Sequence, residues 1–351
     1  MMNCSLFPDN PNHCTVIINI RRAFSTLSLV GCIFVIFIIW LFRKYKYFVQ
    51  RLILALTVAA AMDSISYLMG AIHEEREPIC VVQAFWMSFF DWAVLLWVCC
   101  IAFNLFMNVI RLRRTENFEK WYHVICWGVS LIMACIPIKQ YGPAGAWCWI
   151  ERGETGLRFG TWYVPLFILI GMLFLVYIYI IVTIQRQVRR WDGTYNPETQ
   201  RDKERLKEDV RPLKAYPVIY LVLSIFPLVN RIQNAVSNDQ AIFALWVLHA
   251  ISSPLQGFFN SVAFALDKET FSRLNLTQMR IAFQSRRAGR KVQEYPSGGG
   301  GGTSDGDMVP IADHAESERP GPEHNYRAAD DVANTTTGAA AASAGGVTVN
   351  F

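Results

Sequence analysis

Long apolar runs separated by short polar loops are the feature that most restricts the fold of this chain. A helix that crosses a membrane needs about 20 mostly apolar residues, and seven stretches of the sequence meet that need. They are residues 23–42, 52–72, 81–110, 121–138, 161–184, 215–236 and 241–266. Charged residues make up 17% of the chain, against about 25% in soluble domains. The sequence therefore predicts an all-α membrane protein, a seven-transmembrane helix bundle over residues 23–266.

The distribution of Lys and Arg predicts how this bundle is oriented. With the N-terminus outside, the cytoplasmic segments hold 26 of these residues and the outer segments hold six. Because basic residues gather on the cytoplasmic side, we expect a plasma-membrane protein with a short extracellular N-terminus, residues 1–22. Residues 267–284 have the pattern of a short amphipathic helix on the inner interface. Residues 285–351, rich in Gly, Ala and Ser, are expected to form a disordered cytoplasmic tail.

Four cysteines lie in the segments expected to be outside: Cys4, Cys14, Cys80 and Cys148. Since that compartment is oxidising, an even number of cysteines suggests two disulfides. A Cys80–Cys148 bond would hold the loop between the fourth and fifth spans over the mouth of the bundle. A Cys4–Cys14 bond would close a small N-terminal loop. The alternative in each case is a pair of free thiols.

Several local strings carry a resemblance to a known family. The second outer loop contains Trp147-Cys148-Trp149-Ile150, the fourth span contains His123-Val124-Ile125-Cys126-Trp127, and the third contains Leu96-Trp97. In this order and placement they resemble the slime-mould cyclic-AMP receptors and related orphan and fungal G-protein-coupled receptors, over about residues 23–285. The resemblance implies a receptor that senses an extracellular small molecule and activates a heterotrimeric G protein.

Two departures narrow the receptor class. The third span ends in Asn108-Val109-Ile110-Arg111 instead of D-R-Y, and the seventh has Asn260-Ser261-Val262-Ala263-Phe264 instead of N-P-x-x-Y. The rhodopsin-type class is therefore disfavoured. The outer N-terminus of about 22 residues is also too short for the hormone-binding domain of secretin-type receptors.

Charged side chains within the spans predict a polar pocket below the outer mouth. A charge in hydrocarbon costs about 2.5 kcal/mol or more, so Asp91 and Arg231 should face the interior of the bundle. They either contact a ligand or form a structural ion pair, and Arg231 has the further option of extending to the outer surface. The other candidate ligand contacts are Trp149 and Glu151 beside the expected disulfide, and His249 and Gln256 on one face of the seventh span.

Further polar residues lie deeper in the spans and at their inner ends. We expect an activation network of Asp63, Asn104, Asn108 and Asn260, with the alternative that these groups only hold helices together. Arg111, Arg113 and Arg114 are candidate G-protein contacts. The positive-inside rule accounts for those arginines without any partner, so only the family resemblance favours docking there.

Other functions fit the sequence less well. A transporter or channel is the main alternative, although neither internal repeats nor a path of ionisable groups is visible. A retinal protein needs a lysine in the middle of the seventh span, and the nearby Lys268 lies past its inner end. No enzyme motif is apparent, so we predict a non-enzyme with no cofactor, no metal site and no nucleic-acid partner. Membrane lipid is an expected partner, and the terminal Val349-Asn350-Phe351 suits a PDZ groove.

Overall fold

The computed structural model describes residues 7, 10, 12–69, 77–111, 113–151, 153–189, 211–236 and 241–287. The chain divides into a unit Met1–Ser297, which holds all of these residues, and a second unit Gly298–Phe351. Cys4 and most of the expected tail, residues 288–351, lie outside the described residues.

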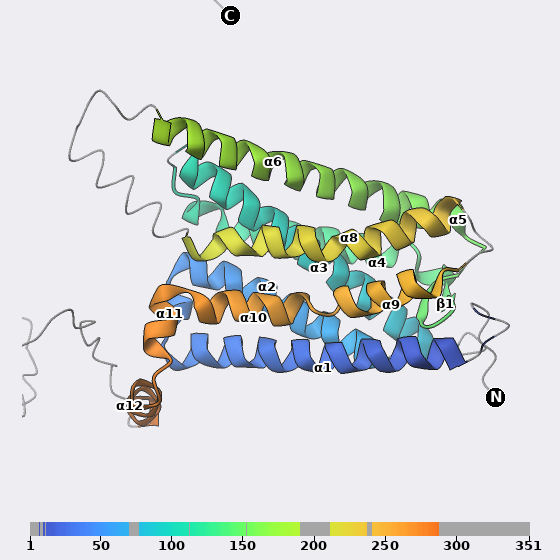
Figure 1. Ribbon diagram of the computed structural model, residues 1–351, viewed down its shortest axis with the longest axis horizontal. Helices are drawn as coiled ribbons and strands as arrows, with labels where there is room; N and C mark the ends of the chain where they lie inside the picture. The colour runs from blue at the N-terminus through green and yellow to red at the C-terminus, as the bar shows by residue number, and fades with distance from the viewer. Residues whose placement is uncertain are drawn as a thin grey trace, which may run out of the picture. The chain divides into compact units, whose positions relative to one another are not determined.

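Helices make up nearly all of the described chain (Figure 1). The long ones are α1 (Asn12–Leu41), α2 (Phe48–Leu68), α3 (Pro78–Val109), α4 (Glu119–Cys135), α6 (Val164–Arg189) and α8 (Ala215–Val236), followed by the shorter α9 (Phe243–Ser252) and α10 (Gln256–Leu266). A short α5 (Thr155–Arg158) and a π-helical turn, Phe159–Tyr163, lead into α6. Two short helices, α11 (Lys268–Arg273) and α12 (Leu276–Arg287), end the described part.

Five helices in the described residues are long and apolar enough to cross a membrane: α1, α2, α3, the stretch Thr155–Thr183 that includes most of α6, and α8. The two other expected spans take different forms. α4 has 17 residues, and the seventh expected span is divided between α9 and α10. Pro254 lies in the turn between them, where its missing N–H and its ring interrupt the helix.

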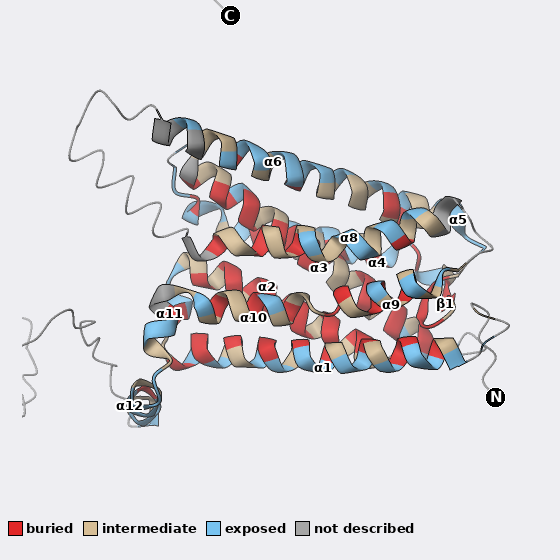
Figure 2. Ribbon diagram, viewed as in Figure 1, coloured by how far each residue is buried: buried red, intermediate tan, exposed pale blue. Residues whose placement is uncertain are grey.

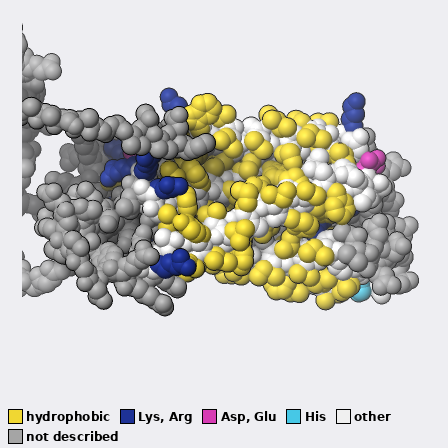
Figure 3. All heavy atoms as spheres, turned by 90° about the horizontal axis from the view of Figure 1, so that it is seen from above, with side chains coloured by type: hydrophobic (Ala, Val, Ile, Leu, Met, Phe, Trp, Pro, Cys, Tyr) yellow, Lys and Arg dark blue, Asp and Glu magenta, His cyan; other side chains and the backbone are white. Residues whose placement is uncertain are grey.

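The helices pack in chain order around an apolar interior. α1 packs against α2 and α10, α2 against α3, α3 against α4, and α8 against α9. Figure 2 shows buried residues on the inward faces of these helices, while α6 is mostly exposed or intermediate. On the face seen in Figure 3, the side chains are mostly apolar over the middle of the molecule, and Lys and Arg lie towards its ends. A surface of this kind fits a hydrocarbon environment, where helices satisfy their own backbone hydrogen bonds.

Both ends of the bundle differ in detail from the expected boundaries. α1 begins at Asn12, so about half of the segment expected as an extended N-terminus is helical. The amphipathic segment expected over 267–284 is two helices, α11 and α12, and the second continues to Arg287. The Asp267 carboxylate accepts a hydrogen bond from the backbone N–H of Thr270 at 3.3 Å, which caps the start of α11.

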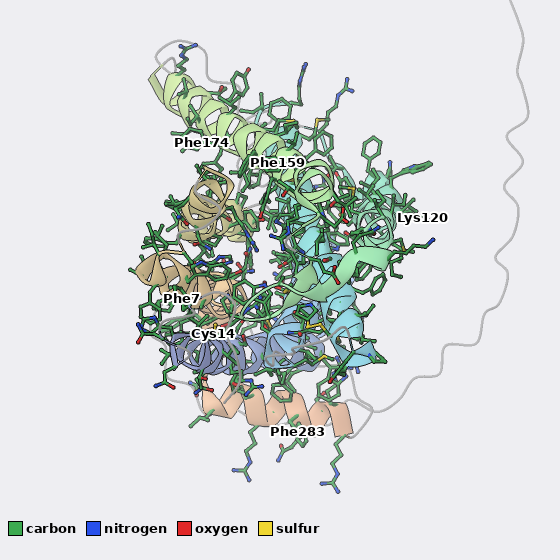
Figure 4. All side chains as sticks on the ribbon, turned by 90° about the vertical axis from the view of Figure 1, so that its right-hand side faces the viewer. Phe7, Cys14, Lys120, Phe159, Phe174 and Phe283 are labelled. Atoms are coloured by element: carbon green, nitrogen blue, oxygen red, sulfur yellow. A yellow bond between two sulfur atoms is a disulfide. The ribbon has the colours of Figure 1, made fainter. Side chains whose placement is uncertain are left out.

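α12 lies across the end of the bundle beside α1, as Figures 1 and 4 show from two directions. Arg286 donates from Nε to the carbonyl of Leu41 at 3.3 Å and from Nη2 to the carbonyl of Trp40. These carbonyls belong to the last turn of α1, where carbonyls have no partners within the helix itself; the Trp40 carbonyl also accepts from the backbone N–H of Arg43 at 3.2 Å. The guanidinium also lies 4.9 Å from the centre of the Trp40 ring. Arg286 therefore attaches α12 to the end of α1.

A hairpin covers the opposite end of the bundle. β1 (Tyr141–Pro143) pairs antiparallel with β2 (Cys148–Ile150), and Tyr141 lies opposite Ile150. The turn contains Gly145 with φ of 114°, a conformation that glycine adopts without a steric penalty. Cys148 forms the predicted disulfide with Cys80 at the start of α3, with a Cα–Cα distance of 5.3 Å. Cys14 is also disulfide-bonded.

Small residues allow α10 to approach α1 closely. A Cβ added at Gly257 would collide with the Ser28 hydroxyl and lie 2.6 Å from the Cys32 sulfur. A Cβ at Gly31 would lie 2.5 Å from the Ser261 hydroxyl oxygen. Close packing of this kind replaces the hydrophobic effect as the force that holds helices together in lipid.

We predict that Gly257→Ala destabilises the bundle by about 1–3 kcal/mol, because overpacking at a tight contact forces the two helices apart. The matched control is Gly128→Ala on α4, since nothing lies within 4 Å of a Cβ added there. Thermal denaturation of the two purified variants measures the difference. Equal melting temperatures for both would contradict this packing.

We also predict that Cys148→Ser lowers stability by up to about 4 kcal/mol, because the disulfide closes a loop with a sequence separation of 68. Cys135→Ser is the control, as Cys135 is a free, exposed thiol. Thermal denaturation with and without a reductant checks the effect. Reductant should lower the melting temperature of the unmodified protein and of Cys135→Ser, and a fall of the same size in Cys148→Ser would speak against the assignment.

Candidate functional site

A polar cavity of about 90 Å³ lies within the bundle, below the hairpin. That volume is enough for several water-sized groups. Residues from α1, α2, α3, β2, α6, α8, α9 and α10 contribute to its walls. Its polar and aromatic lining includes Arg21, Asp63, Tyr67, Asp91, Trp149, Trp162, Arg231, His249, Ser253 and Gln256. Figure 4, which looks along the bundle, shows the helices around the interior and the side chains that they direct into it.

Asp91, on α3, is held by a hydroxyl from α2. The Tyr67 hydroxyl donates to the Asp91 carboxylate at 2.7 Å. The Tyr67 hydroxyl oxygen also lies 3.3 Å from the hydroxyl oxygen of Ser253. Asp63 lies one helical turn before Tyr67, is buried, and is close enough to Asp91 for the two carboxylates to interact electrostatically. Two acidic groups and one tyrosine from neighbouring helices therefore form one side of the cavity.

Arg21 supplies a cation that the sequence interpretation missed. The loop count placed it among the outer residues, but in the structure it lies on α1 and is only 5% exposed. Its guanidinium lies 4.0 Å from the centre of the Tyr67 ring and 4.1 Å from that of Trp147. Nη2 approaches the Met87 sulfur at 3.1 Å, while Nη1 is buried without a hydrogen-bond partner among the described residues.

A signal for Arg21 was present in the sequence. Ser25, Ser28 and Cys32 follow it at spacings of four, three and four residues, which places all four on one face of a helix. An arginine at the head of a polar and small-residue stripe is expected to face the interior once the helix is allowed to begin earlier.

Arg231, on α8, stacks on the hairpin. Its guanidinium is 4.6 Å from the centre of the Trp149 ring and 5.9 Å from that of Tyr163. Among the ion pairs of the described residues, none joins Arg231 to Asp91. The structural ion pair considered from the sequence is therefore not formed. The cation is held by aromatic faces instead, and both residues line the same cavity.

His249 and Gln256 enter the cavity from either side of the break between α9 and α10. His249 is 5% exposed, and its Nδ1 lies 2.9 Å from Nδ2 of Asn230 on α8. Gln256 has its Nε2 buried without a hydrogen-bond partner among the described residues. Glu151 is not part of the lining. Its side chain lies over Gly142 of the hairpin, so its position next to the disulfide loop did not bring it to the cavity.

The residues expected to form an activation network lie in separate places. Asp63 lines the cavity. Asn108 donates to the backbone and side-chain oxygens of Asn104 at 2.9 and 3.0 Å, and Asn104 donates to the Thr115 hydroxyl. Asn260 is buried on α10, and both of its amide atoms lack a hydrogen-bond partner among the described residues. No hydrogen bond among these four described residues joins α3 to α10.

The three candidate G-protein contacts, Arg111, Arg113 and Arg114, are all exposed just beyond the end of α3. Arg114 lies 3.9 Å from Glu116 in a weak ion pair. From Asp91 to Arg111 the rise is about 30 Å at 1.5 Å per residue. The cavity and this arginine cluster therefore lie near opposite ends of the same helix.

Comparison with known proteins fits this architecture. The family model of the slime mold cyclic AMP receptor matches residues 10–288. Cyclic AMP receptor-like protein A of Dictyostelium discoideum is 27% identical over 78% of this chain and 70% of its own length. G-protein coupled receptor 1 of Arabidopsis thaliana is 28% identical over 72% of this chain and 78% of its own.

Cyclic AMP receptor 1 of Dictyostelium discoideum is 27% identical over 74% of this chain, which spans 65% of that relative's length. The relatives are receptors rather than enzymes, and with the apolar helices they support a multi-pass plasma-membrane protein. A family match of this extent, over a helical bundle with the Cys80–Cys148 disulfide, leads to one conclusion. The chain is a G-protein-coupled-receptor-like protein that belongs to the slime mold cyclic AMP receptor family.

Proposed function

We propose that this protein is a receptor that binds an extracellular small polar molecule in the cavity below the hairpin and activates a heterotrimeric G protein at the other end of the bundle. The observation that carries the proposal is the composition of the cavity. Two guanidiniums and two carboxylates from four helices meet around one space of about 90 Å³. Charges inside a membrane protein are costly and concentrate at functional sites.

The proposal includes seven spans. α4, with 17 residues, lies at the lower limit of length for a spanning helix, and its apolar residues Trp121, Val124 and Ile132 are exposed. α9 and α10 together cover Phe243–Leu266, enough for one interrupted span. Added to the five longer helices, they give seven. The excess of 26 basic residues over six supports an extracellular N-terminus and a cytoplasmic C-terminus.

The cavity chemistry favours a ligand with both an acceptor and a donor. Arg21 offers an unused N–H at Nη1, and Arg231 lies on an aromatic face with no ion pair to Asp91. Both guanidiniums suit a ligand group that is anionic or a strong hydrogen-bond acceptor. Asp91 suits a donor, because its carboxylate accepts from Tyr67 and retains further lone pairs. Trp149 and Trp162, which meet at 5.9 Å between ring centres, offer flat surfaces for stacking.

The inner end of the bundle is the proposed docking surface for the G protein. Arg111, Arg113 and Arg114 are exposed there, and α11 and α12 border it with further basic residues. α12 is proposed to lie in the inner interface, with Leu276 and Phe283 exposed to lipid. The chain terminus at Phe351 remains a candidate PDZ ligand.

The test expresses the full chain in cells and measures activation of co-expressed G proteins against nucleotides, including cyclic AMP, sugars and amino acids. Asp91→Asn and Arg231→Gln should each raise the half-maximal agonist concentration at least about tenfold, because each removes a charged hydrogen-bonding partner. Surface expression, measured in parallel, separates loss of binding from loss of folding.

Glu151→Gln is the matched control, since Glu151 lies beside the same loop and outside the cavity lining. It should respond like the unmodified receptor. The receptor proposal would be wrong if no ligand activates a G protein, if no constitutive activity appears, and if the purified protein moves solute across liposome membranes. A transporter or channel would then replace it.

A further inference from the structure

A second recess lies between α3 and α6, away from the polar cavity. It has a volume of about 250 Å³ and eight lining residues: Cys99, Ala102, Phe103, Phe106, Leu169, Met172, Leu173 and Val176. All are apolar apart from the Cys99 thiol. Phe103 and Met172 are 45% and 55% exposed, so this α3–α6 groove opens towards the hydrocarbon around the helices.

A basic hollow adjoins the groove at the end of α3. It has a volume of about 400 Å³ and is lined by Phe106, Met107, Arg111 and Arg113. Phe106 lines both recesses, so the apolar groove and the basic hollow adjoin at this side chain. The backbone N–H of Arg113 bonds to the carbonyl of Met107 at 3.1 Å, and this wide turn brings Arg113 back beside Arg111.

Arg111 and Arg113 differ from nearby arginines because no acidic side chain pairs with them among the described residues. Arg51 bonds Glu119 through two nitrogens, at 2.5 and 2.7 Å, and Arg114 lies 3.9 Å from Glu116. In the part of the chain that the structure describes, neither Arg111 nor Arg113 has a side-chain hydrogen bond or ion pair. Each guanidinium therefore keeps all five donors available for an anionic group.

We propose that the α3–α6 groove and the basic hollow together bind an anionic phospholipid, with an acyl chain along the groove and the phosphate at Arg111 and Arg113. Charge and shape agree with this occupant. The groove offers apolar contacts where the chain of a lipid lies, and the arginines lie at the headgroup level of the adjoining leaflet. A soluble anion would fill only the hollow, and a sterol or neutral lipid would leave both arginines unmatched.

This site goes beyond the receptor function and rests on only one part of it, the placement of the inner end of α3 at a membrane surface. Its connection to the receptor function comes from shared residues. Arg111 and Arg113 are also proposed to meet the G protein, so bound lipid would occupy part of the surface that the G protein needs.

The probe for this site is phosphatidylserine with a photoreactive diazirine in its acyl chain, added to the purified full chain in detergent micelles. After irradiation, mass spectrometry of peptides locates the label. We expect labelling concentrated on Phe103, Phe106, Met172 and Val176, and stronger labelling than with the phosphatidylcholine analogue. Neither a ligand nor a G protein is present, so failure here leaves the receptor proposal untouched.

Two pairs of variants separate the headgroup and chain contributions. Arg111→Gln with Arg113→Gln should reduce groove labelling by phosphatidylserine about 25-fold, at about fivefold per arginine, and leave phosphatidylcholine labelling unchanged. Arg114→Gln removes one charge outside the hollow, as many as either single variant removes within it, and should have little effect. Met172→Trp fills the groove and should reduce labelling by both lipids, whereas Ile178→Trp, exposed on another face of α6, should not.

Four results would overturn the proposal. The first is label spread evenly over the exposed apolar faces, including α4. The second is equal labelling by the two lipids. The third is a loss in Arg114→Gln as large as in the double variant. The fourth is unchanged labelling in Met172→Trp. Size-exclusion chromatography of each variant before irradiation confirms that it is folded, and the single variants Arg111→Gln and Arg113→Gln replace the double variant if that one aggregates.

Discussion

The cost of burying charge in a helical bundle governs the architecture around the cavity. Arg21 is only 5% exposed, and it is stabilised by the faces of Tyr67 and Trp147 and by the Met87 sulfur. Arg231 is likewise stabilised by Trp149. Removing the partner of a buried charge leaves that charge uncompensated. The resulting loss of folding free energy is larger than the net stabilisation that the interaction contributes. The aromatic residues of the hairpin and α2 are therefore required where they lie, and the disulfide that fixes the hairpin to α3 holds Trp147 and Trp149 over the two cations.

The second constraint is the interruption of the seventh helical segment. Pro254 ends α9 and lets α10 begin at Gln256, so the two halves present His249 and Gln256 to the same cavity. Gly257 and Gly31 then let α10 approach α1. A continuous helix would offer one polar stripe along its length, whereas the broken one brings residues from both sides of the break to a single interior site. Interruptions of this kind are tolerated in membranes where they line a cavity.

Hydropathy predicted the five helices that are long and apolar enough to cross a membrane, because a spanning segment has to be long and apolar whatever its neighbours are. It did not reveal the earlier start of α1 or the break between α9 and α10. It located α8 at Ala215–Val236 despite two prolines and Arg231. The outer compartment of the cysteines, together with the places of Cys80 at the start of a span and Cys148 in the loop above it, predicted the disulfide that the structure contains. Arg21 was missed because counting Lys and Arg outside the predicted spans treats each of them as exposed to solvent. Only the tertiary contacts show that Arg21 is buried on α1. Glu151 was expected near the cavity because it follows the disulfide-bonded Cys148, but β2 ends at Ile150, so strand alternation does not carry Glu151 to the face of Trp149, and its side chain lies over Gly142.

The anchoring of the helices indicates which of them is free to respond to the cavity. α3 is tied at its hairpin end by the disulfide and near its other end by the Asn104–Thr115 hydrogen bond. α8 is attached less firmly, since few of its described residues are buried, and Pro227 within it lines the cavity. That proline removes one backbone hydrogen bond and lowers the cost of bending at that point. A ligand that draws Arg231 away from Trp149 would act on α8 about one turn from Pro227. The two proposed inner partners, lipid at α3–α6 and G protein at the end of α3, lie beside the fixed helix, so a movement of α8 would change the surface next to them without disturbing their arginines.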